Sequence, residues 1–126
     1  MSHPIAVIDF ETTGISPGQG ARATEVAVVL VEGGRVVDQF QSLMNAGVRI
    51  PPFITQLTGI TNAMVADAPP AAEVMAQARR FVGDTPLVAH NAPFDRGFWQ
   101  AELARANCDA PQPFACTVRL ARRLYP

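Results

Sequence analysis

Apolar residues follow two patterns along this chain: short runs or alternations typical of strands, and a spacing of three to four positions typical of helices. The first pattern predicts strands at Ile5–Ile8, Glu25–Glu32, Arg35–Leu43, Pro86–Ala89 and Phe114–Cys116. The second predicts helices at Ala71–Val82, about Phe94–Ala106 and Val118–Leu124, with short helical turns at Phe53–Leu57 and Asn62–Val65. Four apolar residues in succession at Ile5–Ile8 predict that the first strand is buried on both faces.

The connections between these elements indicate the fold class. Gly33-Gly34 lies between the second and third strands and is a two-residue hairpin signal, because both turn positions require positive φ. The first three strands should therefore form an antiparallel meander. Later strands alternate with helices, which predicts an α/β architecture with a mixed sheet flanked by helices.

Two carboxylates follow the first apolar run. Asp9 and Glu11 are two positions apart, so their side chains point to the same side of a strand with Cα atoms about 6.8 Å apart. Two converging acids repel each other, and a hard cation such as Mg²⁺ or Mn²⁺ would relieve that repulsion. The alternative is a strand end that carries two solvated acids, and the spacing is compatible with both interpretations.

Asp95 is a third candidate. It falls in the first turn of the helix that follows the Pro86–Ala89 strand, where a carboxylate suits the helix dipole. Taken alone, the interaction with the helix dipole would be enough to explain an acid at this position. Its position after a second buried strand also allows it to face Asp9 and Glu11 at one edge of the sheet.

Composition narrows the function classes. The 126 residues are 48% hydrophobic and 17% charged, which is typical of one globular domain. The net charge of −1 argues against a protein that grips duplex nucleic acid through a broad basic surface. It leaves room for an enzyme that holds a few nucleotides through metal ions.

Cysteines and targeting signals suggest a cytoplasmic protein. Cys108 and Cys116 have no metal-ligand or redox spacing and are expected to be reduced. The first residues lead directly into a strand without a signal peptide, and no apolar run approaches the roughly 20 residues of a membrane span.

Two motifs resemble those of a known family. Asp9-Phe10-Glu11-Thr12-Thr13-Gly14 and His90-Asn91-Ala92-Pro93-Phe94-Asp95 are similar to the first two motifs of the DEDD 3′–5′ exonucleases, DEDDh subclass. Within that family the likeness is greatest to proofreading epsilon subunits of bacterial DNA polymerase III. It runs through nearly the whole chain and includes Leu57-Thr58-Gly59-Ile60-Thr61 and Cys116-Thr117.

The resemblance implies a ribonuclease H-like fold and hydrolysis of a terminal phosphodiester with two Mg²⁺ or Mn²⁺ ions. By it, Asp9 would bridge both ions, and Glu11 and Asp95 would complete the ligand set. The substrate-binding residues that it implies are Thr12, Thr13, Gly14, Leu57, Thr58 and Phe94. Each of the last three also has a structural interpretation, Leu57 and Phe94 in the core and Thr58 in a turn.

The third motif of the family is not found. It consists of a histidine or tyrosine followed five or four residues later by a fourth carboxylate. The family carries this motif beyond the helix that opens near Thr117, where neither His3 nor His90 can supply it; the chain stops at Pro126, and Tyr125 has no acid after it. The resemblance gives His90 a structural role at a strand end. Residues 1–126 are therefore expected to form one incomplete exonuclease domain that lacks its C-terminal part.

Two consequences are expected from this departure. The chain should be inactive or impaired, and it should self-associate through the apolar surface that the missing part would cover. The expected partners are a single-stranded nucleic-acid 3′ end and, as a candidate, a DNA polymerase subunit. Three other functions compete: a non-catalytic nucleic-acid module, a metal-dependent hydrolase of small nucleotides, and a structural association domain.

Overall fold

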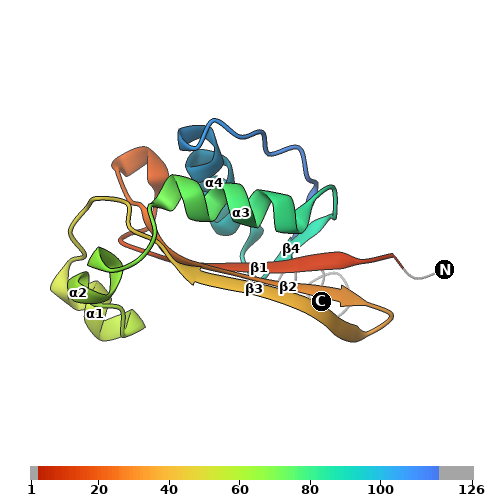
Figure 1. Ribbon diagram of the computed structural model, residues 1–126, viewed down its shortest axis with the longest axis horizontal. Helices are drawn as coiled ribbons and strands as arrows, with labels where there is room; N and C mark the ends of the chain where they lie inside the picture. Colours follow the sequence, from red (N-terminus) through yellow and green to blue (C-terminus); the bar gives the residue numbers. More distant parts are fainter. Residues whose placement is uncertain (1–2, 117–126) are drawn as a thin grey trace, which may run out of the picture.

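A five-stranded mixed sheet organises the protein (Figure 1). The computed structural model describes residues 3–116. The strands are β1 (Ile5–Thr12), β2 (Ala23–Glu32), β3 (Arg35–Leu43), β4 (Leu87–Ala89) and β5 (Phe114–Cys116), in the order β3-β2-β1-β4-β5. The helices are α1 (Pro52–Thr58), α2 (Asn62–Ala66), α3 (Ala71–Val82) and α4 (Ala92–Arg105), with a 3₁₀ turn at Pro17–Gln19.

The first three strands form the predicted antiparallel meander. β1 pairs with β2, and β2 pairs with β3. Gly33 and Gly34 have φ values of +60° and +75° between the paired residues Glu32 and Arg35. The hairpin predicted from this glycine pair is therefore confirmed.

The other half of the sheet is parallel. β4 pairs with β1 through residues 87 and 88, and β5 pairs with β4. Parallel strands end at the same edge, so α4, which follows β4, begins near the carboxyl end of β1. This topology brings the two sequence motifs together.

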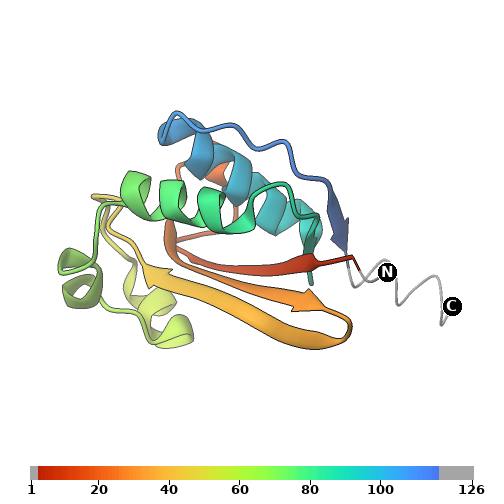
Figure 2. The same ribbon diagram turned by 45° about the vertical axis from the view of Figure 1, so that its right-hand side comes forward.

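Helices α3 and α4 lie on the same face of the sheet (Figures 1 and 2). Each contributes a buried apolar stripe to the core, and the largest side chains are Trp99 and Phe98 of α4. The bounds of α3 agree with those predicted from its apolar spacing, and Gly83 follows its last residue as expected. The predicted α/β architecture is confirmed.

The prediction that β1 is buried on both faces was wrong. Its side chains alternate: Ala6, Ile8 and Phe10 are buried, whereas Val7 is 37% exposed. The reason is that, within residues 3–116, α3 and α4 cover one face of the sheet. Self-association through apolar surface stays a prediction.

Helices α1 and α2 form a separate unit beyond the end of the sheet that is distant from the glycine hairpin (Figure 1). Four apolar residues hold it together: Ile50, Ile54, Ile60 and Val65. Both helices are short, and Thr61 caps α2 by accepting a hydrogen bond from the Met64 N–H. This unit stands beside the carboxyl end of β1.

Several predicted boundaries move. β1 continues through the first motif to Thr12, β2 begins two residues earlier than predicted, and α4 begins at Ala92. The predicted Val118–Leu124 helix lies outside the described residues. Among the helices of residues 3–116, none has the length and apolarity needed to cross a membrane.

Candidate active site

Asp9 and Glu11 project from the face of β1 that is opposite to α3 and α4. They flank Phe10, which is buried in the core at 3% exposure, so strand alternation sends both carboxylates to the opposite face. Asp9 is exposed and Glu11 is half-buried. The register places Glu25 of β2 directly opposite Glu11, which adds a third negative charge on this face.

Asp95 reaches the same strand from α4. Its Oδ1 accepts a hydrogen bond from the Phe10 backbone N–H at 3.2 Å, and the residue as a whole is only 4% exposed. The Phe10 N–H lies beyond the last residue of β1 that pairs with β4. Asp95 therefore takes the place of a strand as the acceptor for this group, which a first-turn acid serving only the helix dipole would not do.

The three acids influence one another electrostatically. Burial, and next the charges of Asp9 and Glu25, raise the pKa of Glu11 above its usual value. Burial raises the pKa of Asp95 to about 6; the Phe10 N–H opposes this shift, and Asp9 and Glu11 add to it. Charge repulsion and desolvation therefore make this edge of the sheet a place where a cation is favoured.

Asp95→Asn should stabilise the metal-free protein at pH 7.5. The ordinary pKa of 3.8 is raised to about 6 in the fold, so the folded state binds more protons than the unfolded state between these values. Stability thus falls as pH rises through that window. Because asparagine keeps an acceptor for Phe10 without the charge, we expect a gain of about 1–3 kcal/mol in unfolding free energy.

Urea unfolding in EDTA at pH 7.5 and pH 3.5 measures this effect. The gain should shrink toward zero at pH 3.5, where Asp95 is protonated in the folded state and mostly protonated in the unfolded state. Asp109→Asn is the matched control, because the Asp109 side chain is 75% exposed. Equal stability of Asp95→Asn and the parent chain at pH 7.5 would contradict the assignment.

The hydroxyl groups of the first motif hold the strand end rather than project freely. Thr12 Oγ1 donates to the Gly14 carbonyl at 2.7 Å, and Thr13 Oγ1 accepts from the Arg22 N–H at 3.0 Å. Gly14 lies close to the returning chain: a Cβ atom there would be 3.3 Å from Cβ of Ala21. These contacts fix the backbone that follows Glu11.

A pocket of about 520 Å³ opens beside Asp9 and Glu11; Asp95 is not among its lining residues. Residues 9–12 form its polar side. The other lining residues are mostly apolar and come from three segments: Gly14, Ile15, Phe53, Ile54, Leu57, Thr58 and Phe94. Pockets of this size accommodate small organic ligands.

The structure distinguishes the candidate substrate residues. Leu57 is 80% exposed at the pocket, so its interpretation as a core residue is wrong. Phe94 serves two surfaces, since it lines the pocket and packs on Phe98 with ring centroids 5.0 Å apart. Thr58 lines the pocket, but its hydroxyl donates to the Ile54 carbonyl and accepts from the Ile60 N–H, as expected of a turn residue.

The donor set at this edge fits a hard cation. Asp9, Glu11 and Asp95 offer carboxylate oxygens, the ligands that Mg²⁺ and Mn²⁺ prefer. In residues 3–116, no three histidine, cysteine or acidic side chains already stand together as a metal site. Three like charges are expected to stay apart until a cation lies between them. The three carboxylates therefore suit a hard cation by their ligand type and charge, although they are not already arranged around a single position.

His90 directly follows the last residue of β4 and is exposed. Its carbonyl accepts a hydrogen bond from Cys116 Sγ at 3.3 Å, which joins the ends of β4 and β5. This contact involves the backbone of His90, so the structural role of its side chain stays a prediction.

Sequence reasoning missed two sets of residues. Phe53 and Ile15 line the pocket and are 66% and 85% exposed. The available signal in the sequence was a large apolar residue in a predicted loop or short helical turn. Glu102 is 2% exposed and pairs with Arg22. A charged residue between Trp99 and Leu103 on the apolar face of a predicted helix was the signal for that buried pair.

Comparisons with known proteins agree with this geometry. Residues 6–126 match the RNase T family model, described as Exonuclease. Protein MT2247 of Mycobacterium tuberculosis, described as a bifunctional exonuclease/endonuclease, is 47% identical over 94% of this chain and 19% of its own length. The 3′-5′ exonuclease DinG of Bacillus subtilis is 39% identical over 95% of this chain and 13% of its own.

PolC-type DNA polymerase III of Clostridium perfringens is 42% identical over 95% of this chain and 8% of its own length. The chain thus spans less than a fifth of each of these relatives. Among solved structures, exonuclease X bound to 5′-overhanging duplex DNA has a TM-score of 0.77 at 33% identity, covering 97% of this chain and 64% of its own. Zinc-bound E. coli exonuclease I with single-stranded DNA has a TM-score of 0.85 at 17% identity, covering 98% and 30%, and this likeness shows the fold alone.

These matches confirm the ribonuclease H-like fold and the DEDD resemblance. The family model matches nearly the whole chain, residues 6–126, and exonuclease X is 33% identical with 64% of its own length covered. The chain therefore belongs to the exonuclease family.

Proposed function

We propose that this domain removes nucleotides one at a time from the 3′ end of single-stranded nucleic acid. The observation that carries the proposal is the 520 Å³ pocket, which has acidic residues on one side and exposed apolar side chains on the other. A phosphodiester beside a metal site and a base on an apolar wall would occupy such a pocket together. DinG, a 3′-5′ exonuclease by name, supports the polarity.

Three carboxylates would hold the metal ions. We assign Asp9 as the shared ligand, and Glu11 and Asp95 as ligands on either side. Two Mg²⁺ or Mn²⁺ ions at this edge would supply an activated water and stabilise the leaving oxygen. Asp95 would be fixed for this role by its hydrogen bond to the Phe10 N–H.

The apolar wall would position the terminal nucleotide. Phe53 and Leu57 project from α1, and Phe94 projects from α4, toward the same cavity. Aromatic and large apolar side chains pack on any base, so the contact would be tolerant of sequence. The remaining substrate-binding candidates would act through the backbone geometry that they fix: Thr12, Thr13, Gly14 and Thr58.

Phe53→Ala should weaken binding of a single-stranded oligonucleotide by about 1–3 kcal/mol, the effect typical of losing one base-stacking side chain. The fold should be unaffected, because Phe53 is 66% exposed. Fluorescence anisotropy of a 5′-labelled oligomer in EDTA, which prevents turnover, measures the change. Val36→Ala is the matched control, since Val36 is 64% exposed on β3 and does not line this pocket; equal affinities of the two variants would contradict the assignment.

Residues 1–126 would act as one exonuclease domain that needs groups from elsewhere for full turnover. The family's third motif supplies a general base and a fourth carboxylate, and its pattern does not occur in the required place in this sequence. A polymerase subunit is a candidate partner, since PolC-type relatives carry the similar segment within a DNA polymerase.

Product analysis tests the proposal. A 5′-labelled single-stranded oligomer incubated with a high concentration of protein and Mn²⁺ should give a ladder that shortens by one nucleotide at a time, and Asp9→Asn should give none. Immediate release of the labelled nucleotide would show the opposite polarity. An oligomer that remains intact while small nucleotides are hydrolysed would favour the competing hydrolase, and an intact oligomer that binds Mn²⁺-loaded protein would favour the non-catalytic module.

A further inference from the structure

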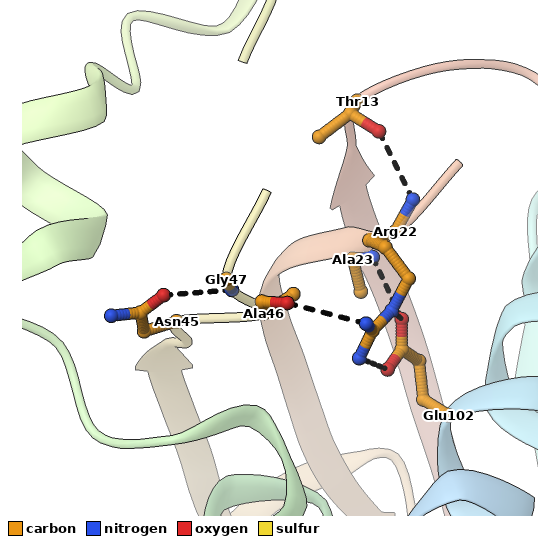
Figure 3. Close-up of polar contacts among 7 residues, drawn as sticks. All are labelled: Thr13, Arg22, Ala23, Asn45, Ala46, Gly47 and Glu102. Carbon is orange, nitrogen blue, oxygen red and sulfur yellow. Dashed lines mark hydrogen bonds and ion pairs between the residues drawn. The ribbon is translucent and has the colours of Figure 1, made fainter. Parts of the chain in front are cut away.

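Glu102 is a buried acid that the proposed chemistry does not use. It lies in α4 at 2% exposure, and its Oε2 accepts the Ala23 backbone N–H at 2.9 Å. Arg22 donates to both carboxylate oxygens, Nη2 to Oε1 at 2.9 Å and Nε to Oε2 at 3.0 Å (Figure 3). Glu102 is therefore doubly bonded to Arg22 and attached to the first residue of β2.

Glu102 and Asp95 share one face of α4. They are seven residues apart, which is nearly two helical turns and about 10.5 Å along the axis. Both carboxylates accept a backbone N–H from the sheet, Phe10 of β1 for Asp95 and Ala23 of β2 for Glu102. Two such bonds, two turns apart, fix both the rotation of the helix and its position along the sheet.

Arg22 extends this connection to the pocket. Its backbone N–H donates to Thr13 Oγ1, and its carbonyl accepts the Thr13 N–H at 2.9 Å, so it holds the end of the first motif. Its Nη1 donates to the Ala46 carbonyl at 3.3 Å, in the segment that leads to α1 (Figure 3). The guanidinium of Arg22 thus joins α4 to the connection that carries Phe53 and Leu57, while its backbone holds the end of the first motif.

We infer that Glu102, paired with Arg22, is a positioning residue that sets where α4 presents Asp95 to Asp9 and Glu11. This inference rests on the proposed metal site for its functional meaning, but its structural part stands on the contacts alone. A bidentate arginine–carboxylate pair resists rotation better than a single bond, because both partners are planar and directional. Shielded from solvent, this pair also holds its geometry at high salt, unlike an exposed pair.

The Phe10 amide reports the position of Asp95 directly. Glu102→Gln keeps an acceptor for Ala23 but loses the charged pair with Arg22. We expect hydrogen exchange at the Phe10 amide to become about 3- to 10-fold faster, the effect of weakening one hydrogen bond, while Val28 in the centre of β2 stays protected. A merely stabilising role would accelerate exchange at Phe10 and Val28 together.

Metal affinity is the second measurement. Calorimetric titration with Mn²⁺ should show a dissociation constant about 10–100-fold higher in Glu102→Gln than in the parent chain, the usual effect of losing a group that orients a ligand. Asp109→Asn is the matched control: it breaks another arginine–carboxylate pair, Arg79–Asp109 at 3.1 Å, which contacts none of the site residues. This control should change neither the Mn²⁺ affinity nor exchange at Phe10.

The two measurements separate the possible failures. A parent chain that binds no Mn²⁺ would refute the proposed function, and exchange at Phe10 would still decide the positioning role. Unchanged Phe10 exchange and unchanged Mn²⁺ affinity in Glu102→Gln would overturn the inference. If that variant does not fold, Arg22→Lys decides the question, because it keeps the charge and loses the two-point contact; normal Phe10 exchange there would likewise overturn it.

Discussion

Asp9→Asn should raise the Mn²⁺ dissociation constant of this domain by more than about 100-fold, because replacing groups that only orient ligands already costs about 10–100-fold. Asp9 is the acid that our assignment places between both ions, and its loss removes one negative charge from the shared position. Asparagine has nearly the same shape and Asp9 is exposed, so the fold should be retained. Calorimetric titration and the Mn²⁺-dependent rise in melting temperature both measure the effect.

Asp67→Asn is the matched control for this variant. Asp67 is exposed, ends α2 and does not line the acidic pocket. It should bind Mn²⁺ as the parent chain does. If Asp9→Asn and Asp67→Asn both retain the parent affinity, the ions bind elsewhere and the assignment of Asp9 is wrong.

The second large effect concerns turnover. On a single-stranded 3′ end with Mn²⁺, the 126-residue chain by itself should be about 10²–10⁴-fold slower than a DEDD exonuclease that carries the third motif, the range typical of a general base. His90 and Asp95 have the spacing of that motif, but Asp95 is turned into the sheet and bonded to the Phe10 N–H. We therefore expect no base from this pair.

His90→Ala makes this prediction sharper. If His90 has a structural role, residual turnover in the variant should stay within a few-fold of the parent chain. A further loss of 100-fold or more would identify His90 as the base. Turnover of the parent chain at the rate of the reference enzyme would contradict the prediction directly.

Local features predicted most of the fold. The apolar spacing of Ala71–Val82 and the glycine that follows it define α3 without reference to any other element. Gly33-Gly34 defines the hairpin because its turn demands positive φ at both positions. Each of these features depends on the conformational preferences of a few neighbouring residues, and the sequence contains those preferences directly.

Features that depend on tertiary contacts were harder to predict. The apolar run at Ile5–Ile8 does not reveal that α3 and α4 lie on only one face of β1 in the described structure. The partner of Glu102 is 80 residues away in sequence, so its spacing to Arg22 carries no local signal. Likewise, a first-turn position explained why Asp95 is tolerated in a helix but not that it accepts the Phe10 N–H.

The candidate site was predictable in part. Strand alternation placed Asp9 and Glu11 on one side, and the position of Asp95 after a second buried strand made it a candidate. The family resemblance added three of the pocket residues, Leu57, Thr58 and Phe94. The wall of the pocket depends on how the α1–α2 unit packs beside the sheet, and this packing turns Phe53 and Leu57 outward while it buries Ile54. No periodicity in so short a helix distinguishes those faces.

A crystal of this chain soaked in Mn²⁺ tests the central claim, that three acids from two distant segments hold metal ions at one edge of the sheet. Anomalous diffraction should locate Mn²⁺ at about 2.0–2.6 Å from oxygens of Asp9, Glu11 and Asp95, the range of hard-cation contacts. A second peak should lie about 3.5–4 Å from the first. Carboxylates that remain in separate solvent positions with no anomalous peak between them would contradict the account.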